Sequence, residues 1–226
     1  IIDGSNVIGT NVAITNDIGI EIIQSSDGSE YIVWSWEHGV NNTANIARVK
    51  SNSTGKSDAW FSGLTGSGTL TKSVPHKLKV GPDGILYCTN GQYLASHDPS
   101  TSSGNTQAFN LGVGWVAVAL ENYGNYLAVL ARHATTYLAG FTRANSRLYL
   151  WDGYSPDPNF VFEIGDYLPT ALKLHEGKLF IFTQGRNNMT RVKLLSGNNI
   201  ITVFESGGIG NSPKPTAVET YKGLLC

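Results

Sequence analysis

The apolar positions of this chain recur in a pattern that repeats along its length. A short strand-like segment, a turn containing glycine and a second, nearly continuous apolar segment occur five times, in residues 20–36, 77–90, 116–131, 171–183 and 217–226. Short apolar runs bounded by turn signals are typical of strands that are buried on both faces. The pattern therefore predicts five β-hairpins with tight turns at Gly28, Gly84, Gly124, Gly177 and Gly223.

A second pair of strand-like segments follows each of the first four hairpins. The third segments are residues 46–50, 93–97, 147–151 and 191–195, and the fourth are 59–64, 107–111, 159–164 and 200–205. A repeated unit of four antiparallel strands is the blade of a β-propeller, in which neighbouring blades cover each other's apolar faces. We therefore predict an all-β propeller of four full blades with a partial or composite fifth.

The repeat also predicts how the chain is divided. At 226 residues we expect a single domain, 1–226, with blades at about 16–66, 67–112, 113–166 and 167–207. Residues 1–15 and 208–226 read as parts of one further blade. Two readings stay open, because these pieces could join and close a five-bladed ring, or the chain could be cut from a propeller of six or seven blades.

Composition and charge narrow the classes of partner. The chain has 26 Gly, one Met and 15% charged residues, which suits strands and turns. Its 16 basic and 17 acidic residues form no run of either sign, so a nucleic-acid partner is not expected. No apolar run approaches the roughly 18 residues of a membrane span. Cys88 and Cys226 form no metal-binding pair, and we expect buried free thiols.

The candidate binding residues lie on one predicted face, formed by loops that join adjacent blades or join second to third strands. They are Trp36, His38, His76, Trp115, Arg132, His133, Tyr137, Arg143, Tyr167 and Arg186. Aromatic rings beside amide and guanidinium donors suit carbohydrate or peptide recognition. The plainer alternative is that large exposed loops contain such residues in any propeller.

One predicted loop, residues 132–146, is longer than a hairpin needs. Besides its basic residues it contains Tyr137 and Phe141, a mixture that is common at protein interfaces. We expect contacts with other protein subunits here. The alternatives are a simple insertion or an extension of the third strand.

Catalytic and metal-binding patterns are weak. The carboxylates that could face a central channel are scattered, at Asp17, Glu21, Glu37, Glu121, Asp166 and Glu219. The five histidines show no ligand spacing, and His97 and His175 are expected in turns. We therefore predict a non-enzyme with no cofactor and no metal site, with a glycosidase as the enzymatic alternative.

The repeats resemble the loosely related propeller units of the NHL and kelch type. More specifically, RLYLWDGYS followed by NFVFEIGDYLPTALKLHEGKLFIFT resembles propeller proteins that tailed bacteriophages carry in tail, baseplate or fibre assemblies. This resemblance implies a structural or protein-interaction module in a virion or another extracellular particle, consistent with the lack of a signal-peptide pattern. The alternative is a lectin-like carbohydrate-binding propeller. Loops of very different length argue against it, because repeated pockets would need similar loops.

Overall fold

The computed structural model describes residues 19–38, 43–51, 56–57, 70–101, 103–133, 146–166, 168–185, 189–206 and 218–225, without the side chains of His38, Thr43, Lys56 and Ser57. Throughout these ranges the chain forms strands and turns and contains no helix, so none of this part has a helix suited to crossing a membrane. The residues divide into two compact units, Ile1–Asn110 (unit 1) and Leu111–Cys226 (unit 2).

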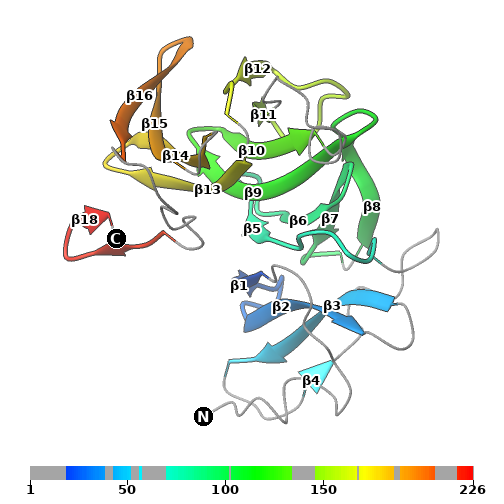
Figure 1. Ribbon diagram of the computed structural model, residues 1–226. Coiled ribbons are helices and arrows are strands. Elements are labelled where there is room, and N and C mark those ends of the chain that lie inside the picture. The colour runs from blue at the N-terminus through cyan, green and yellow to red at the C-terminus, as the bar shows by residue number, and fades with distance from the viewer. Residues whose placement is uncertain are drawn as a thin grey trace. The chain divides into compact units, whose positions relative to one another are not determined.

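Unit 1 contains two four-stranded antiparallel sheets (Figure 1). The first sheet is β1 (Ile20–Gln24), β2 (Glu30–His38), β3 (Thr43–Lys50) and β4 (Lys56–Ser57). The second sheet is β5 (Leu78–Val80), β6 (Leu86–Asn90), β7 (Tyr93–Asp98) and β8 (Ser103–Asn110). In both sheets the strands pair in chain order, which is the predicted blade topology.

Unit 2 contains two more sheets of the same topology and a short hairpin. The third sheet is β9 (Trp115–Tyr123), β10 (Tyr126–His133), β11 (Ser146–Trp151) and β12 (Phe160–Glu163). The fourth sheet is β13 (Leu168–His175), β14 (Lys178–Gln184), β15 (Thr190–Ser196) and β16 (Asn199–Glu205), and the hairpin is β17 (Thr220–Tyr221) and β18 (Leu224–Leu225). Each four-stranded sheet falls within one predicted blade.

The five turn glycines have the backbone conformation that tight hairpins require. Their φ angles are positive, and the values are Gly28 76°, Gly84 80°, Gly124 60°, Gly177 73° and Gly223 76°. A residue with a Cβ is strained in this region, whereas glycine is not. The predicted turns are therefore confirmed at all five positions.

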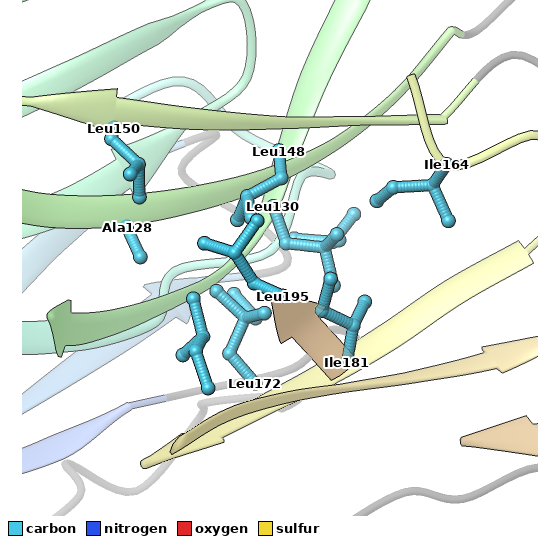
Figure 2. Packing of buried hydrophobic residues seen from close by; sticks show 11 residues of the cluster. Ala128, Leu130, Leu148, Leu150, Ile164, Leu172, Ile181 and Leu195 are labelled. Carbon is cyan, nitrogen blue, oxygen red and sulfur yellow. The ribbon is translucent and has the colours of Figure 1, made fainter. Parts of the chain in front are cut away.

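The core of unit 2 lies between the third and fourth sheets. Figure 2 shows Leu130 and Leu148 of the third sheet meeting Leu172, Ile181 and Leu195 of the fourth. In unit 1 a second cluster joins the first two sheets in the same way. Within each unit the apolar second strands are buried because its two four-stranded sheets cover each other's faces.

The third and fourth sheets share one irregularity that fixes their alignment. The register between β9 and β10 shifts at Leu130 and Ala131 of β10, so that the extra residue belongs to β9. In the pairing of β13 with β14, one extra residue of β13 stands between Pro169 and Ala171. These bulges lie at the same point of the repeat, so Ala131 corresponds to Thr183. Residues of the two sheets can therefore be compared position by position.

Several predicted boundaries are corrected. Strand β10 continues to His133 and β11 begins at Ser146, so Arg132 and His133 belong to a strand rather than to the long loop. His97 lies inside β7 and is buried, and His175 ends β13; neither is in a turn. Strands continue past the residues that sequence patterns mark as their ends, because backbone pairing with a neighbour does not depend on side-chain polarity.

The remaining predictions on the fold have different outcomes. Cys88 is a buried free thiol, as expected, and burial raises its pKa. Cys226, the predicted fourth strand at 59–64 and residues 1–15 lie outside the described residues. The choice between a composite fifth blade and a larger propeller therefore stays open.

Candidate functional site

Two arginine–glutamate ion pairs stand at equivalent positions of the third and fourth sheets. Arg147 Nε donates to Glu163 Oε1 at 2.5 Å, and Arg191 Nε donates to Glu205 Oε2 at 2.5 Å. The side chains are partly exposed, at 35% and 61% in the first pair and 28% and 40% in the second. Both pairs therefore combine a fixed geometry with access to solvent.

The strands position both pairs in the same way. Each arginine is the second residue of the third strand, after Ser146 or Thr190, and each glutamate ends the fourth strand in the sequence Val-Phe-Glu. Arginine and glutamate are direct cross-strand partners in both registers. Opposite charges in this arrangement attract each other across the strands.

In the third sheet an aromatic group holds the arginine. The Cζ atom of Arg147 lies 4.3 Å from the centroid of the Trp115 ring, a cation–π contact. His133 and Tyr149 meet the same indole edge-on, with ring centroids at 5.2 and 6.3 Å. Burial raises the pKa of Tyr149. Trp115 is thereby packed on several sides, and it supports Arg147 more than it presents an open ring.

A glycine allows this packing. Gly114 has φ +84°, and a Cβ added there would lie 2.6 Å from His133 Nε2. A side chain at this position would displace the imidazole from the indole, because contacts that short do not occur between real atoms. The sequence Gly-Trp at 114–115 is therefore part of the site.

In the fourth sheet a buried carboxylate holds the arginine. Asp166 accepts hydrogen bonds from Thr183 Oγ1 at 2.6 Å and from Arg191 Nη1 at 2.6 Å, and Lys193 Nζ lies 3.1 Å from its second oxygen. Burial by itself raises the pKa of Asp166, but these three partners outweigh it and keep the pKa below the ordinary value. Glu205 and then Asp166 raise the pKa of Arg191.

Buried hydroxyl groups tie the connecting segments to the second strands. The side-chain hydroxyls donate as follows: Ser35 to the carbonyl of His76 at 2.7 Å, Thr89 to the carbonyl of Pro75 at 2.6 Å, and Thr183 to Asp166 at 2.6 Å. These residues anchor the segments that join one blade to the next. The signal in the sequence is a Ser or Thr near the end of an apolar second strand.

The predicted binding residues have varied surroundings. In unit 1, Trp36 is half-buried against an apolar cluster, and His76 is buried with Nε2 at 2.8 Å from the carbonyl of Thr71. Burial lowers the pKa of His76. In unit 2, Trp115 and His133 are in contact, and Arg132 follows Ala131 on β10.

The side chains of the other five predicted residues are outside the part that the structure describes. Tyr137, Arg143, Tyr167 and Arg186 lie outside the described residues, and only the backbone of His38 is described. For all ten residues the binding role stays a prediction. The ion-paired residues Arg147, Glu163, Arg191 and Glu205 were not among the predicted binding residues, although the repeated Val-Phe-Glu could have indicated them.

The carboxylates predicted to face a channel have different surroundings where the structure describes them. Glu37 and Asp166 are buried, and Glu219 pairs with Lys173 at 2.6 Å. In the same part of the chain no three His, Cys, Asp or Glu side chains are grouped as metal ligands would be. The predictions of a non-enzyme without a metal stay predictions.

Comparison with known proteins identifies the fold. No family model matches the sequence, and no curated protein matches it. The structure is similar to the fucose-specific lectin from Aleuria aurantia, with a TM-score of 0.54, 15% identity and coverage of 88% of this chain and 66% of the lectin.

Two further structures are similar at the same level. A mutant of AofleA from Arthrobotrys oligospora has a TM-score of 0.53 and 12% identity, and the match covers 96% of this chain and 65% of that one. The polysaccharide lyase Uly1 has a TM-score of 0.52 and 12% identity, and the match covers 91% of this chain and 53% of the lyase. The chain thus spans about two thirds of the lectin and of AofleA and about half of the lyase. At these identities the likeness shows the fold alone, and this chain has the predicted β-propeller fold.

Proposed function

We propose that this chain binds glycans through the two Arg–Glu pairs of unit 2. The observation that carries the proposal is the repetition itself. The same residue types, in the same register and partly exposed, occur at the ends of the outer strands of two consecutive blades. A salt bridge at such an exposed position adds little to stability, so a repeated one is more easily explained by binding.

The chemistry of the pair suits sugar hydroxyl groups. An arginine has five N–H donors, and a carboxylate accepts several hydrogen bonds. The contact between Arg147 and Glu163 uses the Nε donor. A sugar hydroxyl both donates and accepts, so it can hydrogen-bond to both members of one pair, and charge-assisted bonds of this kind are strong.

The aromatic residues of the repeat also agree with glycan binding. Trp115 supports Arg147 in the third sheet. In the sequence, Trp115-Val-Ala-Val-Ala-Leu aligns with Tyr167-Leu-Pro-Thr-Ala-Leu, and the bulges of β9 and β13 fall at the same step of this alignment. Both blades therefore carry an aromatic residue, an arginine and a glutamate in the same order.

The propeller fold that this chain shares with a fucose-specific lectin supports the same proposal. Unequal loop lengths do not exclude repeated sites here, because the paired residues lie on strands. Strand register repeats from blade to blade even where loops differ. Two similar sites are thus compatible with very different loops.

A second candidate is a module for protein contacts, as in a virion. Exposed apolar side chains on the outer strands β12 and β16 favour it, among them Phe160, Ile201 and Phe204. Outer strands with apolar side chains are common sites of association. This candidate predicts self-association or partner binding that does not depend on the Arg–Glu pairs.

A glycan microarray tests the glycan proposal directly. We expect the purified chain to bind a set of glycans, and Arg147→Ala combined with Arg191→Ala to abolish binding. Each lost charge-assisted hydrogen bond is worth about 1.5–3 kcal/mol, which corresponds to at least tenfold in affinity. Arg48→Ala is the matched control, because Arg48 is a third-strand arginine of unit 1 that lies over Tyr31.

Two outcomes would contradict the proposal. The first is a folded wild-type protein, checked by circular dichroism, that binds no glycan on the array. The second is a double variant that binds as well as Arg48→Ala.

A further inference from the structure

We infer that the two Arg–Glu pairs select neutral sugars with adjacent hydroxyl groups and discriminate against acidic sugars. This inference rests on the proposed glycan-binding function and specifies its ligand. The charges around each arginine differ in detail between the two blades but balance in both.

In the third sheet one cation faces one carboxylate. The Arg147 guanidinium is matched by Glu163 at 2.5 Å, and its face is covered by the neutral indole of Trp115. Arg132 does not add charge here. It follows Ala131, the cross-strand partner of Arg147, so its side chain leaves the strand on the opposite face.

In the fourth sheet two cations face two carboxylates. Arg191 pairs with Glu205 at 2.5 Å and with Asp166 at 2.6 Å, and Lys193 lies 3.1 Å from Asp166. Asp166 is buried and stays ionised, since its pKa is held below the ordinary value. This group therefore also has no excess positive charge.

An acidic sugar is a poor match for balanced pairs. A carboxylate or sulfate on the ligand only accepts hydrogen bonds, so it would compete with the glutamate for the arginine and would be repelled by it. Like charges brought together at a binding site are costly. A pair of neighbouring hydroxyls can instead accept from the arginine and donate to the glutamate while the ion pair stays intact.

The first experiment compares sugars that differ only at C6. Methyl galactoside, glucoside and mannoside are each compared with the corresponding methyl uronoside by calorimetry at pH 7, or as competitors of array binding. We expect every sugar that binds to be preferred in its neutral form by at least about tenfold. A preference for the uronic acids would overturn the inference and leave glycan binding intact, whereas the absence of binding by any glycan would overturn the proposed function.

The second experiment removes the balancing charges. Glu163→Gln combined with Glu205→Gln keeps the shape and an amide oxygen but leaves Arg147 without its carboxylate. We expect the ratio of neutral to acidic affinity to fall at least about tenfold. Glu176→Gln is the matched control, because Glu176 is exposed in the turn between β13 and β14. An unchanged ratio in the double variant would overturn the inference.

Discussion

Units 1 and 2 contain four-stranded sheets of the same topology but have different kinds of residue at one position of the third strand. Opposite the buried end of the second strand, unit 1 has Ile46 and Leu94, which are both 0% exposed. Unit 2 has Arg147 and Arg191 at this position, with partly exposed side chains. One position of the repeat thus serves the core in unit 1 and a polar rim in unit 2.

The fourth strand accounts for the difference. In the second sheet Leu94 pairs with Phe109, which is buried. In the third and fourth sheets the partners are Glu163 and Glu205. In unit 1 an aromatic ring thus stands across from the leucine, whereas in unit 2 a carboxylate stands across from each arginine.

The largest expected effect comes from moving the arginine of unit 2 into unit 1. Leu94→Arg should lower the free energy of unfolding by about 4 kcal/mol, because Phe109 cannot match the buried charge. Urea denaturation followed by circular dichroism measures this. Leu94→Met is the control and should cost less than about 1.5 kcal/mol. A loss of under about 1 kcal/mol for the arginine variant would show that the two units do not differ as described.

A smaller effect is expected from Asp166→Asn, which leaves Arg191 and Lys193 without their buried partner. We expect a loss of about 3 kcal/mol at pH 7. Asp157→Asn, at an exposed position of a turn, is the control and should change stability by less than about 0.5 kcal/mol.

The pH dependence of this variant sharpens the comparison. The native pKa of Asp166 lies below the roughly 3.9 of an unfolded aspartate. The contribution of Asp166 to the free energy of unfolding is therefore complete above the unfolded pKa, and it is lost as the pH falls through the lower pKa of the native state. The difference between the wild type and Asp166→Asn should shrink on going from pH ~5 toward pH ~3. A difference that stays constant or grows would rule out an ionised Asp166 as the source of this stability.

The smallest expected effect concerns the hydroxyl anchors. Thr89 donates to the carbonyl of Pro75 and accepts from the amide of Lys77, whereas Ala131 at the same position of the third sheet has no hydroxyl. Thr89→Val should cost about 1–2 kcal/mol by thermal or urea unfolding, because two partly buried backbone groups lose their partner. Thr202→Val, on the exposed strand β16, should be close to neutral. Equal effects of the two variants would argue against the anchor.

Much of the fold could be predicted because its signals are local. Gly124 and Gly177 mark turns that need positive φ, and the apolar runs that follow them mark buried strands. The predicted ends of the strands are less accurate. Sequence polarity placed Arg132 in a loop, but β10 continues through it because pairing with β11 continues to Ser146.

The candidate site was harder to predict for the same physical reason. Predicted loop positions included Trp115 and His133, which the structure brings together, but not Arg147 or Glu163. Arg147 and Glu163 are 16 residues apart, and only the antiparallel register places them opposite each other. The repeated Val-Phe-Glu is visible in the sequence, but the sequence does not show that its glutamate faces an arginine of the third strand.

The sequence alone therefore determined the all-β repeat, its turns and its strand order, because these depend on backbone conformation and on apolar periodicity within short segments. The tertiary structure decided which charges meet. Arg191, Asp166 and Glu205 come from three separate segments, and their pairing depends on a bulge, on strand register and on burial. Electrostatic matching acts through space over a few ångströms, and a linear pattern of residues does not encode such distances.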